Sequence, residues 1–269
     1  MEYDPIKNKL GGFFNKSPFL RKVFYNLLDL LLLRTWHIHK QIKLWSREFG
    51  TANAKILDAG MGFGQYSFWM ANKHRNWNIL GVDVKHEQIA DCNNFFSKVG
   101  LTNARFEFAD LTAFSHPDTY DFALSVDVME HILEDVTVFK NIYASLHKGG
   151  MLLISTPSDQ GGSDVDDSSG ESFIGEHVRN GYNINEIQEK LKTAGFSKIE
   201  AAYAYGKPGH ISWILSMKYP MKMLSFSKAL LILLPFYYLI TFPFALILNK
   251  MDTDGKHATG TGLIVKAWK

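Results

Sequence analysis

Residues 54–205 alternate between short apolar runs and longer stretches in which apolar side chains recur every three or four positions. Short runs of this kind are typical of buried strands, and the longer stretches are typical of helices packed on one face. The apolar runs lie at residues 55–57, 78–82, 106–108, 122–126, 152–154 and 199–201. Strands that alternate with helices predict an α/β fold, doubly wound, with a mainly parallel sheet.

The pattern of residues 1–50 predicts helices ahead of this core. Asp4-Pro5 and Ser17-Pro18 each join an N-cap residue to a proline suited to the first helical turn. We expect the second helix to continue to about Phe49-Gly50. Its apolar stretch is too short to span a membrane. We therefore expect these helices to cover one edge of the core, with contact to a membrane or a substrate tail as the alternative.

A second apolar stretch, Ala229–Leu248, contains no charged residue over 20 positions and is bracketed by Lys228 and Lys250. Its length would suffice for a membrane span. Pro235 and Pro243 instead predict two or three short helical pieces.

The position of this insertion also argues against a single crossing. If residues 263–265 complete the same sheet as residues 199–201, both ends of the insertion lie on one side of any bilayer. We expect a re-entrant or in-plane apolar hairpin, because it satisfies that constraint. A helical cap on the protein's own core and a homodimer interface remain alternatives.

Charge is distributed unevenly along the chain. The net charge is +2, but basic and acidic side chains number 9 and 4 in residues 1–50, 12 and 21 in residues 51–205, and 8 and 2 in residues 206–269. The small total argues against a nucleic-acid-binding protein, whereas the two basic, apolar ends suit an anionic surface. We therefore predict four segments, which are a helical segment at 1–50, a core at 51–205, an apolar helical insertion at 206–258 and a final strand at 259–269.

The most informative motif joins a buried strand to a helix through a glycine-rich turn containing Gly60, Gly62 and Gly64. Glycine permits positive φ and lets the backbone approach a ligand closely. In an open α/β sheet, such a turn lies where ligands bind. A dinucleotide-binding protein is the main competing interpretation, but its glycine spacing differs from that of these three residues.

Acidic residues follow the next two strands. Asp83 ends the second strand, and a carboxylate there can accept both hydroxyls of a ribose. Asp110-Leu111 ends the third, where a carboxylate can accept from an exocyclic amine and a backbone N–H can reach a ring nitrogen. Together with the glycine turn, these positions indicate a nucleoside-containing ligand.

At residues 54–205 the chain resembles the class I S-adenosylmethionine-dependent methyltransferases. The resemblance implies a Rossmann-like, seven-stranded sheet whose last strand, at about residues 262–266, is antiparallel. It implies S-adenosyl-L-methionine as the cofactor. The implied cofactor-binding residues are Asp58, Gly60, Gly62, Gly64, Tyr66, Asp83, Asp110, Leu111 and Ser125. Tyr66 would close over the methionine part, although core packing explains it equally well.

Residues 125–132 resemble the segment after the fourth strand in the small-molecule and quinone-type O-methyltransferases. Methyl transfer needs alignment of the acceptor and, for a hydroxyl acceptor, removal of a proton. His131, His177 and Asp127 are the candidate bases, and a purely structural role remains the alternative for each. Arg179 is expected to pair with an acidic substrate group or with the acidic loop. We expect no metal site, because His37 and His39 do not share a helix face.

These observations predict transfer of a methyl group to a hydrophobic or lipid-like small molecule, by O-methylation at a membrane surface. A soluble enzyme with a hydrophobic lid and a non-catalytic, membrane-anchored binding module are the alternatives. Cys92 is the only cysteine, which suits a reducing compartment. We expect a cytoplasmic protein, peripheral or monotopic on the inner face of the membrane. The polar loop at residues 158–172 is expected to act as a mobile lid.

Overall fold

The computed structural model describes residues 17–48, 53–161 and 178–269. Several predictions concern residues outside these ranges. They are the Asp4-Pro5 helix start, the helix end at Phe49-Gly50, most of the expected lid and the candidate base His177.

Seven strands form one sheet in the order β3-β2-β1-β4-β5-β7-β6. The first five strands are parallel, and β7 runs antiparallel to both β5 and β6. This topology confirms the predicted Rossmann-like methyltransferase fold with an antiparallel final strand. The strands are β1 (Lys55–Ala59), β2 (Asn78–Asp83), β3 (Ala104–Phe108), β4 (Tyr120–Val126), β5 (Leu146–Pro157), β6 (Lys198–Ala204) and β7 (Gly262–Trp268).

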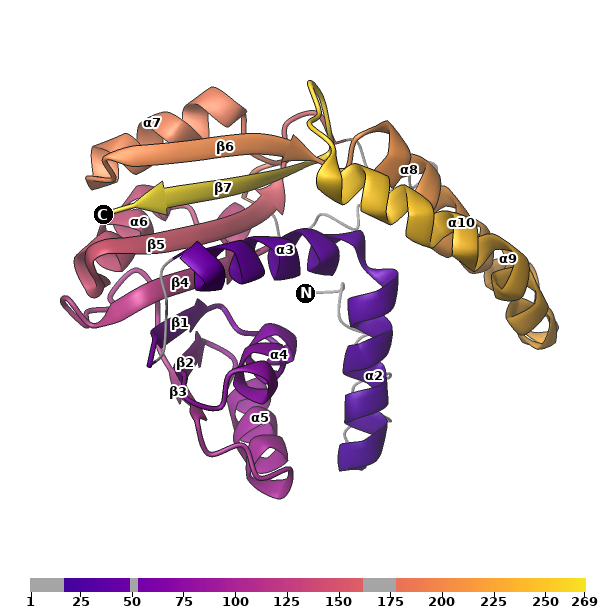
Figure 1. Cartoon of the computed structure of the whole chain (residues 1–269), viewed down its shortest axis with the longest axis horizontal. Coiled ribbons are helices and arrows are strands. Elements are labelled where there is room, and N and C mark those ends of the chain that lie inside the picture. Colours follow the sequence, from indigo (N-terminus) through magenta and orange to yellow (C-terminus); the bar gives the residue numbers. More distant parts are fainter. Residues whose placement is uncertain (1–16, 49–52, 162–177) are drawn as a thin grey trace.

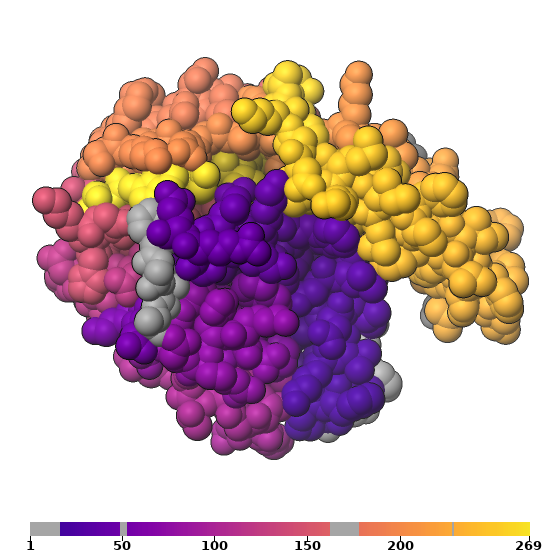
Figure 2. Space-filling view, in the orientation of Figure 1, coloured from indigo at the N-terminus to yellow at the C-terminus, as the bar shows by residue number. Residues whose placement is uncertain are grey.

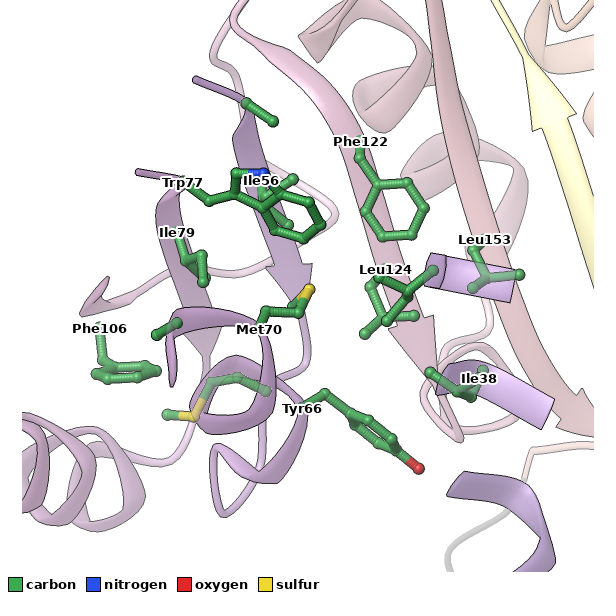
Figure 3. Close-up of a cluster of buried hydrophobic side chains, with 14 of the residues drawn as sticks. Ile38, Ile56, Tyr66, Met70, Trp77, Ile79, Phe106, Phe122, Leu124 and Leu153 are labelled. Atoms are coloured by element: carbon green, nitrogen blue, oxygen red, sulfur yellow. The ribbon is translucent and has the colours of Figure 1, made fainter. Parts of the chain in front are cut away.

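Helices cover both faces of the sheet (Figure 1). Alternate residues of β1 show why, since Ile56 packs into one hydrophobic cluster and Leu57 into the other. The first cluster, part of which is shown in Figure 3, lies under α3 (Leu33–Glu48), α4 (Gln65–Lys73) and α5 (His86–Lys98). The second lies under α6 (Asp135–Ser145) and α7 (Ile184–Ala194).

Residues 17–48 form two helices, where a single helix from Ser17-Pro18 to about Phe49-Gly50 was expected. α2 (Pro18–Leu31) is capped at its start by Ser17, whose hydroxyl accepts from the Phe19 N–H at 3.3 Å. Its C-cap residue Leu32 has extended backbone, which ends the helix. α3 then starts in a different direction (Figure 1). The break lets α3 lie on the sheet while α2 reaches the glycine turn, where the Arg21 guanidinium donates to the Phe63 carbonyl at 3.1 Å.

The insertion before β7 is a helical hairpin that projects from the body of the protein (Figures 1 and 2). We call residues 207–254 the apolar hairpin. Its outgoing arm consists of α8 (Lys207–Trp213), the π-helical turn η3 (Ile214–Lys218) and α9 (Tyr219–Phe226). The 3-10 helix η4 (Lys228–Leu233) leads into the returning helix α10 (Leu234–Asp254).

The hairpin agrees with the prediction that both ends of the insertion meet the sheet, because β6 and β7 are neighbours. The expected division of Ala229–Leu248 into short pieces was wrong at Pro243, since α10 runs through this proline. Pro235 lies in the first turn, where no backbone hydrogen bond is lost. Pro243 removes one such bond, and the packing of α10 along α8 and η3 overrides that loss.

Candidate functional site

The glycine turn lies between β1 and α4. Gly60, Gly62 and Gly64 have φ values of 79°, 51° and 71°, a region that L side chains rarely adopt. A Cβ on Gly60 would overlap the Val128 side chain, whereas one on Gly62 would meet none of the described residues within 4 Å. The turn is therefore packed tightly at its first glycine and open at its second, where a ligand can approach the backbone.

Asp83, at the end of β2, is hydrogen-bonded to this turn. One carboxylate oxygen accepts from the Gly62 N–H at 3.0 Å, and the other accepts from the Lys85 N–H at 3.0 Å. Each oxygen has a further lone pair for a hydroxyl donor. Two backbone hydrogen bonds thus hold Asp83 in place, and its carboxylate can still accept from the hydroxyls of a ribose.

Asp58 has a different environment from Asp83. It is 2% exposed, and its carboxylate accepts from the Ser67 hydroxyl at 2.6 Å. Burial raises the pKa of Asp58 to about 6, against the lowering effect of the Ser67 hydrogen bond. In this arrangement Asp58 joins β1 to the first turn of α4, which follows the glycine turn.

Asp110 and Leu111 follow β3 at the same edge of the sheet. The Ala109 N–H donates to the Asp83 carbonyl at 3.1 Å, which holds this segment beside the end of β2. Asp110 is exposed, and its carboxylate accepts from the Thr112 N–H at 2.8 Å, while Leu111 is buried. Hydrogen bonds from Thr112 lower the pKa of Asp110. The ionised Asp110 carboxylate, which can accept a hydrogen bond, is therefore followed directly by the apolar side chain of Leu111.

Two buried hydroxyls, those of Tyr66 and Ser125, have no hydrogen-bond partner within the described part of the chain. Tyr66 is 8% exposed and Ser125 is fully buried. Figure 3 shows the Tyr66 ring at the border of the hydrophobic cluster with its hydroxyl directed away from it. Buried hydroxyls are normally paired, so both groups suit a bound ligand with polar atoms.

The segment after β4 carries two candidate bases, of which Asp127 contacts α3. Asp127 has a positive φ of 50°, and its carboxylate pairs with the Arg34 guanidinium. His131 is exposed at the end of the short helix η1 (Met129–His131). Between them, Glu130 is 1% exposed and accepts from the Thr156 hydroxyl at 3.0 Å, and burial raises its pKa. Glu130 thereby anchors the segment that carries both candidates.

Arg34 was absent from the sequence-based site because it seemed only to interrupt an apolar helix. Its proximity to Asp127 depends on the break at Leu32, which no local motif announces.

Arg179 has a structural environment. Its guanidinium pairs with Asp135 and donates to the carbonyls of Met129 at 3.1 Å and Ile132 at 3.0 Å. Asp135 also accepts from Lys190 at 2.7 Å. These contacts join the segment after β4 to α7, so neither a substrate anion nor the acidic loop is needed to explain Arg179.

Comparison with known proteins agrees with this geometry. Residues 56–150 match the family described as "Methyltransferase domain". Phosphoethanolamine N-methyltransferase 1 of Zea mays is 30% identical over 152 residues, covering 55% of this chain and 29% of that protein. (S)-Coclaurine N-methyltransferase of Thalictrum flavum subsp. glaucum is 29% identical over 99 residues, 37% of this chain and 27% of that protein. The chain thus spans less than a third of the length of these curated relatives.

Solved structures show the same fold. Haemonchus contortus phosphoethanolamine N-methyltransferase 2, in complex with S-adenosyl-L-methionine, has a TM-score of 0.59 at 20% identity and covers 91% of this chain and 60% of that one. The [4+2]-cyclase SpnF has a TM-score of 0.55 at 17% identity, over 81% and 75% of the two chains.

Residues 56–150 therefore match a methyltransferase domain, and the sheet around them has the class I methyltransferase topology. S-adenosyl-L-methionine is the cofactor of this class, and the site residues fit it. Asp83 offers the ribose acceptors beside the glycine turn, and Tyr66 and Ser125 offer hydroxyls that have no partner among residues 17–48, 53–161 and 178–269.

Proposed function

We propose that this protein transfers the methyl group of S-adenosyl-L-methionine to a small molecule with a hydrophobic part, at a membrane surface. One relationship carries the proposal. Strands β1 to β6 all end at the same edge of the sheet, because β5 and β6 both run antiparallel to β7. The glycine turn follows β1 at this edge, and the apolar hairpin leaves β6 at the same edge.

The residues of the site divide into two groups. Asp83, Asp110 and the Gly62 backbone hold the nucleoside part of the cofactor, which supplies an electrophilic methyl group when bound. The Tyr66 and Ser125 hydroxyls would be free to pair with polar atoms of its methionine part. Class I geometry places the acceptor near the end of β4, so Asp127 and His131 are the described candidates for taking a proton from it. His177 keeps the same candidate role.

The acceptor atom that we propose first is a nitrogen. The relatives are described as phosphoethanolamine and (S)-coclaurine N-methyltransferases, which weighs against the O-methylation expected from residues 125–132. An amine must be neutral to attack a methyl group, so a nearby proton acceptor serves either atom. Oxygen remains the alternative acceptor.

Two further features belong to the proposal. The expected location is the cytoplasmic side of a membrane, with the hairpin as the attachment. A soluble enzyme with a hydrophobic lid, a homodimer joined through the hairpin and a non-catalytic binding module are the rival explanations of the same hairpin.

The test uses the purified full chain with S-adenosyl-L-methionine labelled in its methyl group. Phosphoethanolamine in solution and vesicles containing phosphatidylethanolamine are offered as separate acceptors, alongside a total lipid extract. We expect label in a lipid fraction, and loss of that label with Asp83→Ala. Calorimetry should show at least a tenfold weaker affinity of this variant for S-adenosylhomocysteine, because a charged hydrogen-bond acceptor is removed. Glu107→Gln, an exposed change on β3, is the control. The proposal would be overturned if the protein did not bind the cofactor, or if it transferred label to none of the acceptors.

A further inference from the structure

The solvent-facing side of α10 is apolar from Phe236 to Ile247, and the exposed Lys250 and Asp254 follow near its end. Its exposed residues recur every three or four positions, so they form one stripe on the helix. We call this the outer stripe, and it consists of Ile232 of η4 together with Phe236, Leu239, Ile240, Phe244, Ile247 and Met251 of α10, with exposures between 55% and 76%. The tip continues it, since Phe226 is 89% exposed. Residues 229–254 are long and apolar enough to cross a membrane, and only 6% of their most apolar window is buried.

The inner side of the same hairpin is polar. The Ser212 hydroxyl donates to the Asn249 side chain at 2.6 Å and lies 3.1 Å from the Ala245 carbonyl. The hydroxyls of Tyr237 and Tyr238 donate across the hairpin to the carbonyls of Leu215 and Ser216, at 2.6 and 2.8 Å.

Small residues line this inner contact. Gly209, Ser212 and Ser216 follow one another at intervals of three and four on the outgoing arm, and they are buried there. Ala245 of α10 is 1% exposed. A helix pair in water shows the opposite arrangement, with apolar side chains inside and polar ones outside. Small residues and interhelical hydrogen bonds inside, with apolar side chains outside, are the arrangement of helices surrounded by lipid.

We propose that the apolar hairpin is embedded in the hydrocarbon of a lipid bilayer, with the outer stripe against the acyl chains. This inference extends the proposed function. It rests on that proposal only for the reason why the protein is attached to a membrane. Because β6 and β7 are neighbours, both ends of the hairpin stay on the side that carries the sheet. The hairpin therefore enters and leaves through one membrane surface.

Charge selects the kind of membrane. Between Glu200 and Asp252 the chain contains no acidic residue but five lysines, at positions 207, 218, 222, 228 and 250. Lysines close to an anionic leaflet are attracted by its negative surface potential. Lys218 and Lys222 lie within the outgoing arm, where long side chains can extend to the headgroups. The same lysines would repel a second copy of the hairpin, so we commit to an anionic leaflet as the partner.

The test is flotation of the full chain with vesicles of phosphatidylcholine alone or mixed with phosphatidylglycerol. We expect binding to the anionic vesicles and much weaker binding to the neutral ones. The double variant Ile240→Asp/Phe244→Asp should bind at least tenfold more weakly, because a carboxylate is strongly disfavoured within hydrocarbon. Leu44→Asp is the matched control, since Leu44 is an apolar residue of α3 that is 44% exposed outside the hairpin.

Affinity for S-adenosylhomocysteine is measured on every variant and should not change, which shows that the core remains folded. Equal flotation of the double variant and the wild type would overturn the inference. The inference would also be overturned if the wild-type protein did not bind vesicles and sedimented as a dimer, while the double variant sedimented as a monomer. A protein that binds vesicles as expected but transfers no methyl group would leave this inference standing and refute the proposed function.

Discussion

The carboxylate of Asp252, near the end of α10, accepts a hydrogen bond from Nε2 of His37 on α3 at 2.8 Å. It also accepts from the backbone N–H groups of Tyr205 at 3.1 Å and Gly209 at 2.9 Å. Asp252 is fully buried. One side chain thus joins the base of the hairpin to α3 and to the end of β6, next to the cofactor edge of the sheet.

Replacing Asp252 by alanine should destabilise the protein by about 3 kcal/mol, because buried donors lose their shared acceptor. Urea unfolding measures the change. Asp254→Asn is the control, since Asp254 is half exposed and pairs with Lys40 and Lys250 at the surface. A loss no larger than that of the control would refute the anchoring role.

Asp252 should also make stability depend on acidity. Burial alone would raise its pKa, but the hydrogen bond and charge of His37, with His257 and Gly209, lower it below the ordinary value. A lowered pKa means that this stabilisation is present above the unfolded-state pKa and is lost as pH falls through the folded one. In acid, the unfolding free energies of wild type and Asp252→Ala should therefore converge.

Asp58 should show the opposite dependence. Its pKa of about 6 lies above the unfolded value, so its contribution is complete below about pH 4 and is lost as pH rises through about 6. Relative to Asp58→Asn, the wild type should lose roughly 2 kcal/mol of stability between these limits. Ser67→Ala should move this window upward, since the hydroxyl lowers the pKa. Parallel pH profiles for wild type and Asp58→Asn would contradict the assignment.

Gly60 and Gly62 should differ in their tolerance of a side chain. Gly60→Ala combines positive φ with overlap on Val128 and should cost about 3 kcal/mol. Gly62→Ala has the backbone cost of about 1 kcal/mol alone, because the space beside it is open. Adding Val128→Ala to Gly60→Ala should restore part of the stability in urea unfolding. No rescue would show that overlap with Val128 is not the cause.

His131→Gln should lower kcat about 100-fold if its imidazole takes the acceptor proton. Affinity for S-adenosylhomocysteine should stay unchanged. His116→Gln is the matched control, because His116 contacts the Tyr120 hydroxyl at 2.7 Å at the amino end of β4, away from the site. If His131→Gln retains full kcat on the acceptor found by label transfer, Asp127 and His177 remain as candidates.

Local sequence features predicted much of the cofactor side. Apolar periodicity placed the strands, and the glycine spacing placed a turn whose positive φ values only glycine adopts readily. Asp83 was predictable because the ends of parallel strands share an edge. The cofactor-binding role of Asp58 stays a prediction. Its burial and its contact with Ser67 depend on how α4 packs.

The acceptor side depends on contacts between distant segments. Arg34 reaches Asp127 across 93 positions of sequence, and Asp252 reaches His37 across 215. Such pairs leave no periodic or spaced pattern, so a local reading cannot find them.

By itself, the sequence determined the strands, the glycine turn and the apolar character of the insertion, because each of these follows from residue types at short spacing. Only the tertiary structure decided that α10 runs unbroken through Pro243, that its Asn249 and Asp252 are buried, and that the hairpin leaves from the edge that carries the glycine turn. The reason is physical, since the direction of a helix and the side that it buries are set by packing between segments that are far apart along the chain.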